Sequence, residues 1–263
     1  MGVAACLLIS FFILDELSYD KHYSNPERTF RVVAEVPING EVIKNAHFQL
    51  PFADALASDY PEIEKAGKYT SSELFGAGQK TIRVSGQAKG IIEDGFVFAS
   101  QPMLDILEFP FVEGQAESAL NEPLSLVITK EKANLLFGNA KALGKTVVLD
   151  NDTANPYTIT GVVDRSSIKS HFHYEYLMHV RDTDFNWVNT NYMTYIKVHE
   201  NTDIEALKQK MHSVVDKYIV PELNQNEFMR KFIDLYKGMN FDLQPIQDIH
   251  LHTDSKMVDN LKH

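Results

Sequence analysis

The feature that most constrains this chain is an apolar run at its beginning. Residues 3–14 read VAACLLISFFIL, in which Ser10 is the only polar residue, and an acidic segment from Asp15 to Asp20 follows directly. A helix needs about 20 apolar residues to span a bilayer, so this run is too short to do so alone. It also lacks the preceding Lys or Arg and the following small-residue cleavage site of a secretory signal.

We therefore interpret residues 1–19 as the C-terminal part of a transmembrane helix and its exit from the membrane. The rest of the chain would then lie outside the bilayer, on one side of it. The alternative is a buried core helix of a soluble protein, because apolar runs of about 10–14 residues also occur there.

The bulk composition excludes several functions. The chain has 263 residues, 44% of them hydrophobic and 23% charged, so it can bury a core without disulfides or metals. Its formal net charge of −11 argues against a nucleic-acid surface, because clustered Lys and Arg bind a phosphate backbone. The single cysteine, Cys6, lies in the apolar run, where its reactive thiolate is disfavoured. We expect no nucleic-acid partner.

The pattern of apolar residues indicates strands and helices in irregular alternation, which is typical of an α+β or mixed α/β fold. Strands are predicted over residues 29–36, 41–48, 124–129, 146–149, 157–163, 192–198 and 240–243, with several short ones over 65–98. Helices are predicted over residues 52–59, 101–107, 130–137, 203–220 and 226–236. We expect Thr129 to cap the helix over 130–137, Gly138 to end it, and Pro221 to end the helix over 203–220.

Two motifs resemble catalytic or nucleotide-binding loops, and each has a simpler interpretation. Residues 138–146 resemble a phosphate loop, but five residues separate the glycines instead of four. A predicted helix precedes this loop and a strand follows, whereas a phosphate site needs a helix N-terminus after the loop. Ser166 and Lys169 have the Ser-x-x-Lys spacing of some acyl-transferring enzymes, but no helical pattern follows them.

Two His-x-His pairs are the remaining candidates for a metal site. They are His171 with His173 and His250 with His252, and four imidazoles could close a tetrahedral zinc site. Nothing in the sequence brings the two pairs together, and neither pair has the i, i+4 spacing of a helical metal site. We therefore name no catalytic, cofactor-binding or metal-binding residue.

Short motifs follow one another in a fixed order along nearly the whole chain. They are DELSYDKH (15–22), NPERTFRV (25–32), LPFADAL (50–56), YPEIE (60–64), FPFVEG (109–114), ALNEP (119–123), LVIT (126–129), LFG (136–138), LGK (143–145), YTITGVV (157–163), SHF (170–172), YMTYI (192–196) and DIHL (248–251). In this order the motifs resemble the MacB-like periplasmic core domain of FtsX-family ABC transporter permeases. Each motif is weak alone, but together they extend from about residue 8 to residue 252.

The resemblance implies two α/β subdomains that follow the end of a transmembrane helix. A porter-like subdomain would comprise residues 20–124 and 201–263, and a sabre-like subdomain would be inserted as residues 125–200. The chain stops soon after the DIHL motif, before the next transmembrane helix that such a permease should have. We therefore expect it to be a fragment of a longer permease.

The resemblance also implies a function. It implies a non-enzymatic domain without a cofactor, on the periplasmic side of a bacterial inner membrane. The domain would couple ATP hydrolysis in the cytoplasm to substrate export or lipoprotein release by mechanical motion. The implied partners are a cytoplasmic ATP-binding subunit, the membrane, a second copy or second half of the permease, and a periplasmic adaptor or lipoprotein.

Two other functions fit parts of the sequence. A membrane-tethered extracytoplasmic sensor or ligand-binding domain would have the same composition and the same apolar start. A hydrolase or metalloenzyme would use the two His-x-His pairs. The ordered motifs favour the permease domain over both.

Overall fold

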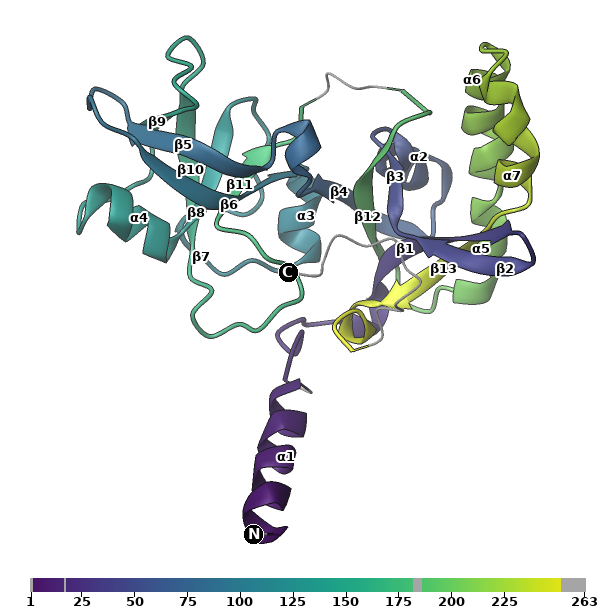
Figure 1. Ribbon diagram of the computed structural model, residues 1–263, viewed down its shortest axis with the longest axis horizontal. Coiled ribbons are helices and arrows are strands. Elements are labelled where there is room, and N and C mark those ends of the chain that lie inside the picture. The colour runs from purple at the N-terminus through teal and green to yellow at the C-terminus, as the bar shows by residue number, and fades with distance from the viewer. Residues whose placement is uncertain (1, 17, 182–185, 252–263) are drawn as a thin grey trace.

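The apolar run forms a helix that projects from the rest of the molecule. The structure, a computed structural model, describes residues 2–16, 18–181 and 186–251. Helix α1 (Gly2–Glu16) extends away from the strands (Figure 1), and Leu8 and Phe11 on it are 70% and 66% exposed. The run is therefore not a buried core helix. Among the described residues, no helix combines the length and the hydropathy that crossing a bilayer requires.

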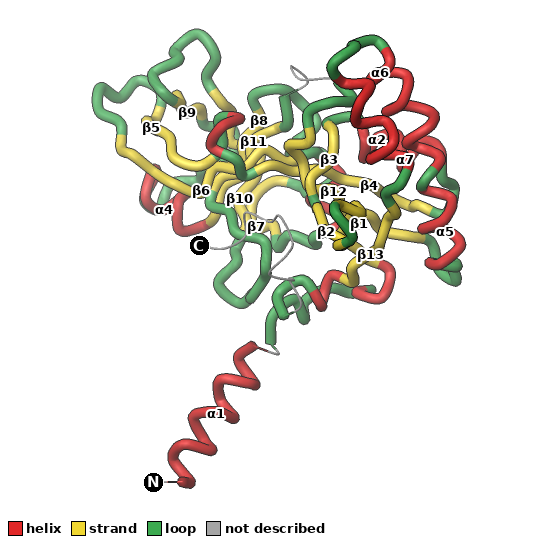
Figure 2. The backbone as a smooth tube through the Cα atoms, turned by 45° about the vertical axis from the view of Figure 1, so that its right-hand side comes forward, coloured by secondary structure: helices red, strands yellow, loops and turns green. Residues whose placement is uncertain are grey.

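Thirteen strands join in one sheet with the order β11-β8-β10-β9-β5-β6-β4-β12-β1-β13, to which β2, β3 and β7 add at β1, β12 and β10. Strand β11 also pairs with β6, and Figure 2 shows the strands running through the middle of the molecule. At one end of the sheet lie β1 (Thr29–Ile38), β2 (Glu41–Asn45), β3 (His47–Gln49), β4 (Ile63–Thr70), β12 (Thr190–Val198) and β13 (Asn240–Pro245). The return strand predicted over 41–48 is divided at Ala46, because its first part pairs with β1 and its second with β12.

Helices pack on this end of the sheet. They are α2 (Phe52–Asp59), α5 (Ile204–Met211), the π-helix η4 (Val215–Ile219), α6 (Val220–Asn224), the 3-10 helix η5 (Met229–Phe232) and α7 (Ile233–Lys237). Their apolar faces meet the strands in a core that includes Val32, Phe52, Leu56 and Leu207.

The long helix predicted over 203–220 begins as expected, since the Asp203 side chain accepts a hydrogen bond from the Ala206 N–H. The prediction that Pro221 ends it is wrong. A π-helix interrupts the helix, and Pro221 lies in the first turn of α6, where its missing N–H is not needed. The helix predicted over 226–236 is likewise divided into η5 and α7.

The other end of the sheet is built from the middle of the chain. It contains β5 (Gly78–Val84), β6 (Ile91–Ala99), β7 (Phe111–Gly114), β8 (Ser125–Thr129), β9 (Thr146–Leu149), β10 (Tyr157–Val163) and β11 (Tyr176–His179), with helices α3 (Gln101–Ile106) and α4 (Lys130–Phe137). The Thr129 side chain accepts a hydrogen bond from the Lys132 N–H and caps α4, which ends at Gly138, as predicted. Strand β10 runs parallel to β8 and antiparallel to β7 and β9.

Another core lies between the two ends and joins them. It brings together residues from the whole length of the chain, including Tyr23, Met103, Phe172, Tyr195 and Ile249. The predicted mixed α/β fold is confirmed. Strand β12 pairs with β1 and β4, and β5 pairs with β9. The subdomain bounds of 20–124 with 201–263, and of 125–200, stay a prediction.

Candidate functional site

The segment that leaves α1, residues 18–28, is attached to distant parts of the chain, and we call it the exit segment. Its most buried member is Asp20, which is 0% exposed. The Asp20 carboxylate lies 2.9 Å from His171 Nδ1 and accepts hydrogen bonds from Ser170 Oγ at 3.0 Å and the His171 N–H at 3.3 Å. The Asp20 N–H donates to the Lys169 carbonyl at 2.8 Å. The exit segment is thereby fixed to the loop that follows β10.

The same imidazole connects Asp20 to strand β12. His171 Nε2 lies 2.8 Å from the Tyr195 hydroxyl, and both side chains are buried. One ring nitrogen therefore faces the Asp20 carboxylate and the other faces the tyrosine hydroxyl, so the imidazole bridges the two groups. We call Asp20, His171 and Tyr195 the Asp20 network. It joins the exit segment, the loop after β10 and β12 through buried polar contacts.

The electrostatics of this network favour a charged Asp20. Burial alone would raise the pKa of its carboxyl. The hydrogen bond and positive potential from His171, with the hydrogen bond from Ser170, outweigh burial and lower the pKa below its ordinary value. A charged carboxylate is therefore held in the core by its partners, and separating it from them would leave a buried charge unpaired.

A second contact joins α1 to the end of the described chain. Glu16 Oε2 lies 3.0 Å from His250 Nε2. The Tyr19 ring stacks on the His250 ring, with centroids 3.6 Å apart and an interplanar angle of 6°. The C-terminal end of α1 therefore packs against the residues that follow β13.

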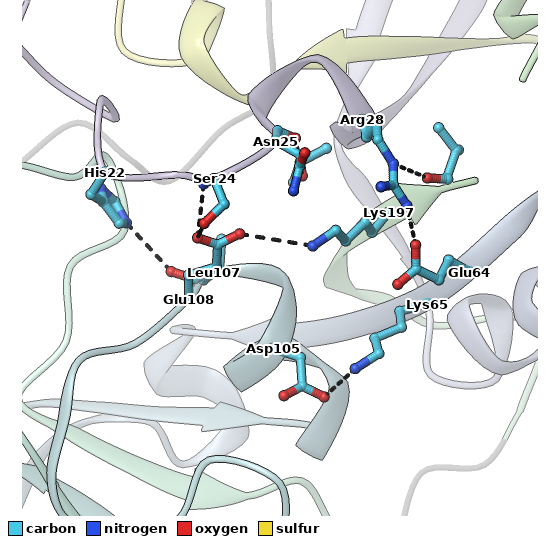
Figure 3. A network of polar contacts seen from close by, with 12 residues as sticks. His22, Ser24, Asn25, Arg28, Glu64, Lys65, Asp105, Leu107, Glu108 and Lys197 are labelled. Carbon is cyan, nitrogen blue, oxygen red and sulfur yellow. Dashed lines mark hydrogen bonds and ion pairs between the residues drawn. The ribbon is translucent and has the colours of Figure 1, made fainter. Parts of the chain in front are cut away.

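The exit segment also contacts the turn after α3 (Figure 3). The Ser24 N–H and hydroxyl both donate to Glu108 Oε2 at 2.8 Å, and Glu108 Oε1 lies 3.8 Å from Lys197 Nζ on β12. His22 Nε2 lies 3.4 Å from the Leu107 carbonyl oxygen. Burial lowers the pKa of His22, which favours its neutral form.

The last residue of the exit segment, Arg28, contacts two strands. Its Nε donates to the Val198 carbonyl at 2.8 Å, and its guanidinium forms an ion pair with Glu64 (Figure 3). Beside it, Lys65 Nζ on β4 lies 2.6 Å from the Asp105 carboxylate on α3. Polar contacts therefore fix the exit segment to β4, α3, β12 and the loop after β10, which together form what we call the exit junction.

The exit junction is suited to holding elements in place and not to binding a substrate. The three side chains of the Asp20 network are buried. A cavity lined by Ser170 and Phe172 beside the network has a volume of about 20 Å³, which is too small for a substrate.

The residues that the sequence singled out lie in separate places. Among the described histidines, His171 belongs to the Asp20 network and His250 pairs with Glu16, while His252 lies outside the described residues. Burial lowers the pKa of His173. In the part of the chain that the structure describes, no three or more His, Cys, Asp or Glu residues are grouped to hold a metal.

The two loop motifs have the simpler interpretation. Residues 138–146 follow helix α4 and lead into β9, so no helix N-terminus follows that loop, as predicted. Ser166 Oγ donates to Asp164 at 2.6 Å in the loop after β10. The hydrogen bonds from Lys130 and Ser166 lower the pKa of Asp164 to about 2.

Sequence reasoning missed the roles of Asp20 and Tyr195. Both occur in motifs that carried the family resemblance, DELSYDKH and YMTYI. Nothing in the spacing of residues 20, 171 and 195 shows that they meet, because the tertiary fold brings them together.

Comparisons with known proteins agree with this architecture. The fold is similar to a domain assigned to a permease protein from Porphyromonas gingivalis, with a TM-score of 0.62, 17% identity, and coverage of 85% of this chain and 92% of that chain. It is also similar to the periplasmic region of MacB from Actinobacillus actinomycetemcomitans, with a TM-score of 0.50, 13% identity, and coverage of 84% and 90%. No curated protein matches the chain. A model of the MacB-like periplasmic core domain matches residues 1–214, and the chain therefore belongs to the family of MacB-like periplasmic core domains.

Proposed function

We propose that this domain couples ATP hydrolysis in the cytoplasm to substrate export or lipoprotein release, by moving together with helix α1. Its family is that of periplasmic domains of ABC-type transporter permeases, which implies a cytoplasmic ATPase partner and a membrane context. The observation that carries the proposal is the exit junction, in which buried and partly buried polar contacts attach the end of α1 and the exit segment to several elements of the domain.

The proposal treats α1 as the periplasmic end of a transmembrane helix. Its exposed apolar side chains, such as Leu8 and Phe11, suit a lipid environment. The backbone hydrogen bonds of a helix are satisfied within the helix, so it can transmit an axial or tilting motion without losing its structure.

The exit junction would pass this motion on to the domain. Glu16 and Tyr19 contact His250, and Asp20 contacts His171, so a displacement of α1 displaces both the end of the described chain and the centre of the sheet. Separating Asp20 from His171 would leave a buried carboxylate without its partners, which is strongly unfavourable. The junction should therefore move as a unit.

The proposal includes a cellular setting and partners. The domain would lie on the periplasmic side of a bacterial inner membrane, as a non-enzymatic part of the permease. Its partners would be the cytoplasmic ATP-binding subunit and a second copy or second half of the permease. A periplasmic adaptor or a lipoprotein would contact its outer surface.

The experiment that tests the proposal measures motion of the domain in the complete transporter. The full-length permease is reconstituted with its ATP-binding subunit in lipid nanodiscs, with Cys6→Ser and a spin label at Leu74→Cys, since Leu74 is 91% exposed. Electron–electron resonance measures the distance between labels on two copies. We expect ATP with vanadate to shift this distance, and His171→Leu to reduce the shift while ATP hydrolysis continues.

A matched variant outside the exit junction serves as the control. Glu62→Gln removes an ion pair with Lys210 on helix α5, and we expect it to leave the ATP-dependent shift unchanged. Circular dichroism establishes that each variant is folded. The same distance distribution with and without ATP would refute mechanical coupling. A full shift in the folded His171→Leu protein would refute the role of the Asp20 network in it.

A further inference from the structure

The domain contains a groove that the proposed function does not use. Strands β1, β2 and β3 form one wall, and η5 with α7 form the other, around a cavity volume of about 580 Å³. Strand β2 and helix α7 lie on the same side of the molecule, apart from α1 (Figure 1). Sites for small molecules usually have volumes of about 300–1,000 Å³, so the groove has a suitable size.

The chemistry of the lining indicates a neutral, apolar ligand. Most lining side chains are aliphatic or aromatic, among them Val36, Ile43, Phe48, Phe232 and Leu235. Among the described residues that line the groove there is no Asp, Glu, Lys or Arg. A charged ligand would lose its hydration there without gaining a counter-charge. The charge pattern of the groove therefore favours an uncharged ligand.

One polar atom in the groove, the side-chain oxygen of Gln49, lacks a hydrogen-bond partner among the described residues. Gln49 lines the groove and is 1% exposed, and its Oε1 accepts no hydrogen bond from the described residues. The same amide makes a hydrogen bond with the phenol of Tyr236, whose pKa is raised by burial. Buried carbonyl oxygens are nearly always hydrogen-bonded in folded proteins. The terminal amide rotates about a single bond, so its oxygen can turn toward a donor placed in the groove.

We propose that this groove binds a neutral, apolar small molecule that donates one hydrogen bond, from a hydroxyl, amide or amine, to Gln49 Oε1. The apolar body of the ligand replaces water along the two walls, and its donor group pairs with the amide oxygen. Most of the affinity comes from apolar burial, while the single polar contact fixes the orientation of the ligand.

The test uses three dyes with one skeleton. N-phenyl-1-naphthylamine is neutral, has one N–H donor and becomes fluorescent in an apolar site. Its N-methyl analogue lacks the donor, and 8-anilinonaphthalene-1-sulfonate adds a charge. We expect the 263-residue chain to bind the neutral amine at least about 5-fold more tightly than either comparison dye. Gln49→Met keeps the length of the side chain and should bring the amine to the affinity of its N-methyl analogue.

Two neighbouring substitutions separate the groove from other apolar surface, including α1. Ile43 lines the groove, whereas Val42 on the same strand does not and is 54% exposed. We expect Ile43→Trp to remove the saturable signal and Val42→Trp to keep it, with both variants folded by circular dichroism. Equal losses in the two variants would overturn the assignment of the site. Equal affinities for the amine and its N-methyl analogue in the native chain would overturn the role of Gln49.

Discussion

Replacing Tyr195 with Phe removes a single hydroxyl from the Asp20 network and tests whether that network stabilises the fold. The hydroxyl lies 2.8 Å from His171 Nε2, and the exposed fractions of Tyr195 and His171 are 0% and 4%. In Tyr195→Phe the ring stays in the core, so no large cavity forms, but His171 Nε2 loses its hydrogen-bond partner at a buried position that water does not reach. An unpaired buried polar atom costs about 1–3 kcal/mol, and we expect the free energy of unfolding to fall by this amount.

Urea unfolding followed by far-UV circular dichroism measures this change. With a denaturant dependence of about 3 kcal/mol per molar urea, the transition midpoint should fall by about 0.3–1 M. The matched control is Tyr218→Phe, because the Tyr218 hydroxyl lies 3.3 Å from Asp59 at a partly exposed position where water can replace it. We expect the control to lose less than about 0.5 kcal/mol. If Tyr195→Phe is no less stable than Tyr218→Phe, the Asp20 network does not hold the junction as we argue.

Two further predictions concern pH and backbone geometry. The pKa of Asp20 is lowered in the folded chain. Asp20 should therefore stabilise the fold at pH values above its ordinary pKa of 3.8, and this contribution should be lost as the pH falls through the lower folded pKa. Stability measured from pH 6 down to pH 2 should therefore fall less steeply below about pH 4 in Asp20→Asn than in the native chain, and equal slopes would contradict the assignment. Gly86 and Gly114 both have positive φ angles, of 86° and 79°. A Cβ atom added at Gly86 would meet nothing within 4 Å, whereas one added at Gly114 would lie 2.4 Å from the Thr160 carbonyl oxygen. We expect Gly86→Ala to lower the free energy of unfolding by about 1–2 kcal/mol, from the left-handed backbone alone, and Gly114→Ala to lower it by about 1–3 kcal/mol more. Similar unfolding midpoints for the two variants would show that the backbone at Gly114 shifts to relieve the contact.

Local patterns in the sequence predicted much of the secondary structure. Helices α2 and α4 and strands β9 and β10 have the predicted bounds, because each is defined by a short apolar pattern with a nearby Pro, Gly or capping residue. The errors occurred where tertiary contacts overrode the local pattern. Ala46 divides a strand because the two parts have different partners, and Pro221 falls in the first turn of a new helix after a π-helix.

The candidate site was less predictable than the fold. The sequence offered His171 and His250 as possible metal ligands. In the structure, His171 contacts Asp20 and Tyr195. His250 contacts Glu16 and Tyr19. These contacts join residues separated by 24 to 234 positions along the chain. Apolar periodicity reports which face of an element is buried, and it contains no information about which polar side chains meet across such separations.

By itself, the sequence determined the apolar helix at the start, the mixed α/β composition, the negative net charge and the ordered motifs of the family, because these depend on composition and short-range spacing. Only the tertiary structure decided that Asp20 is buried against His171 and Tyr195, and that Gln49 lies without a partner for its oxygen in an apolar groove. The physical reason is that burial and hydrogen bonding are set by which surfaces pack together, and that packing is a property of the folded chain as a whole.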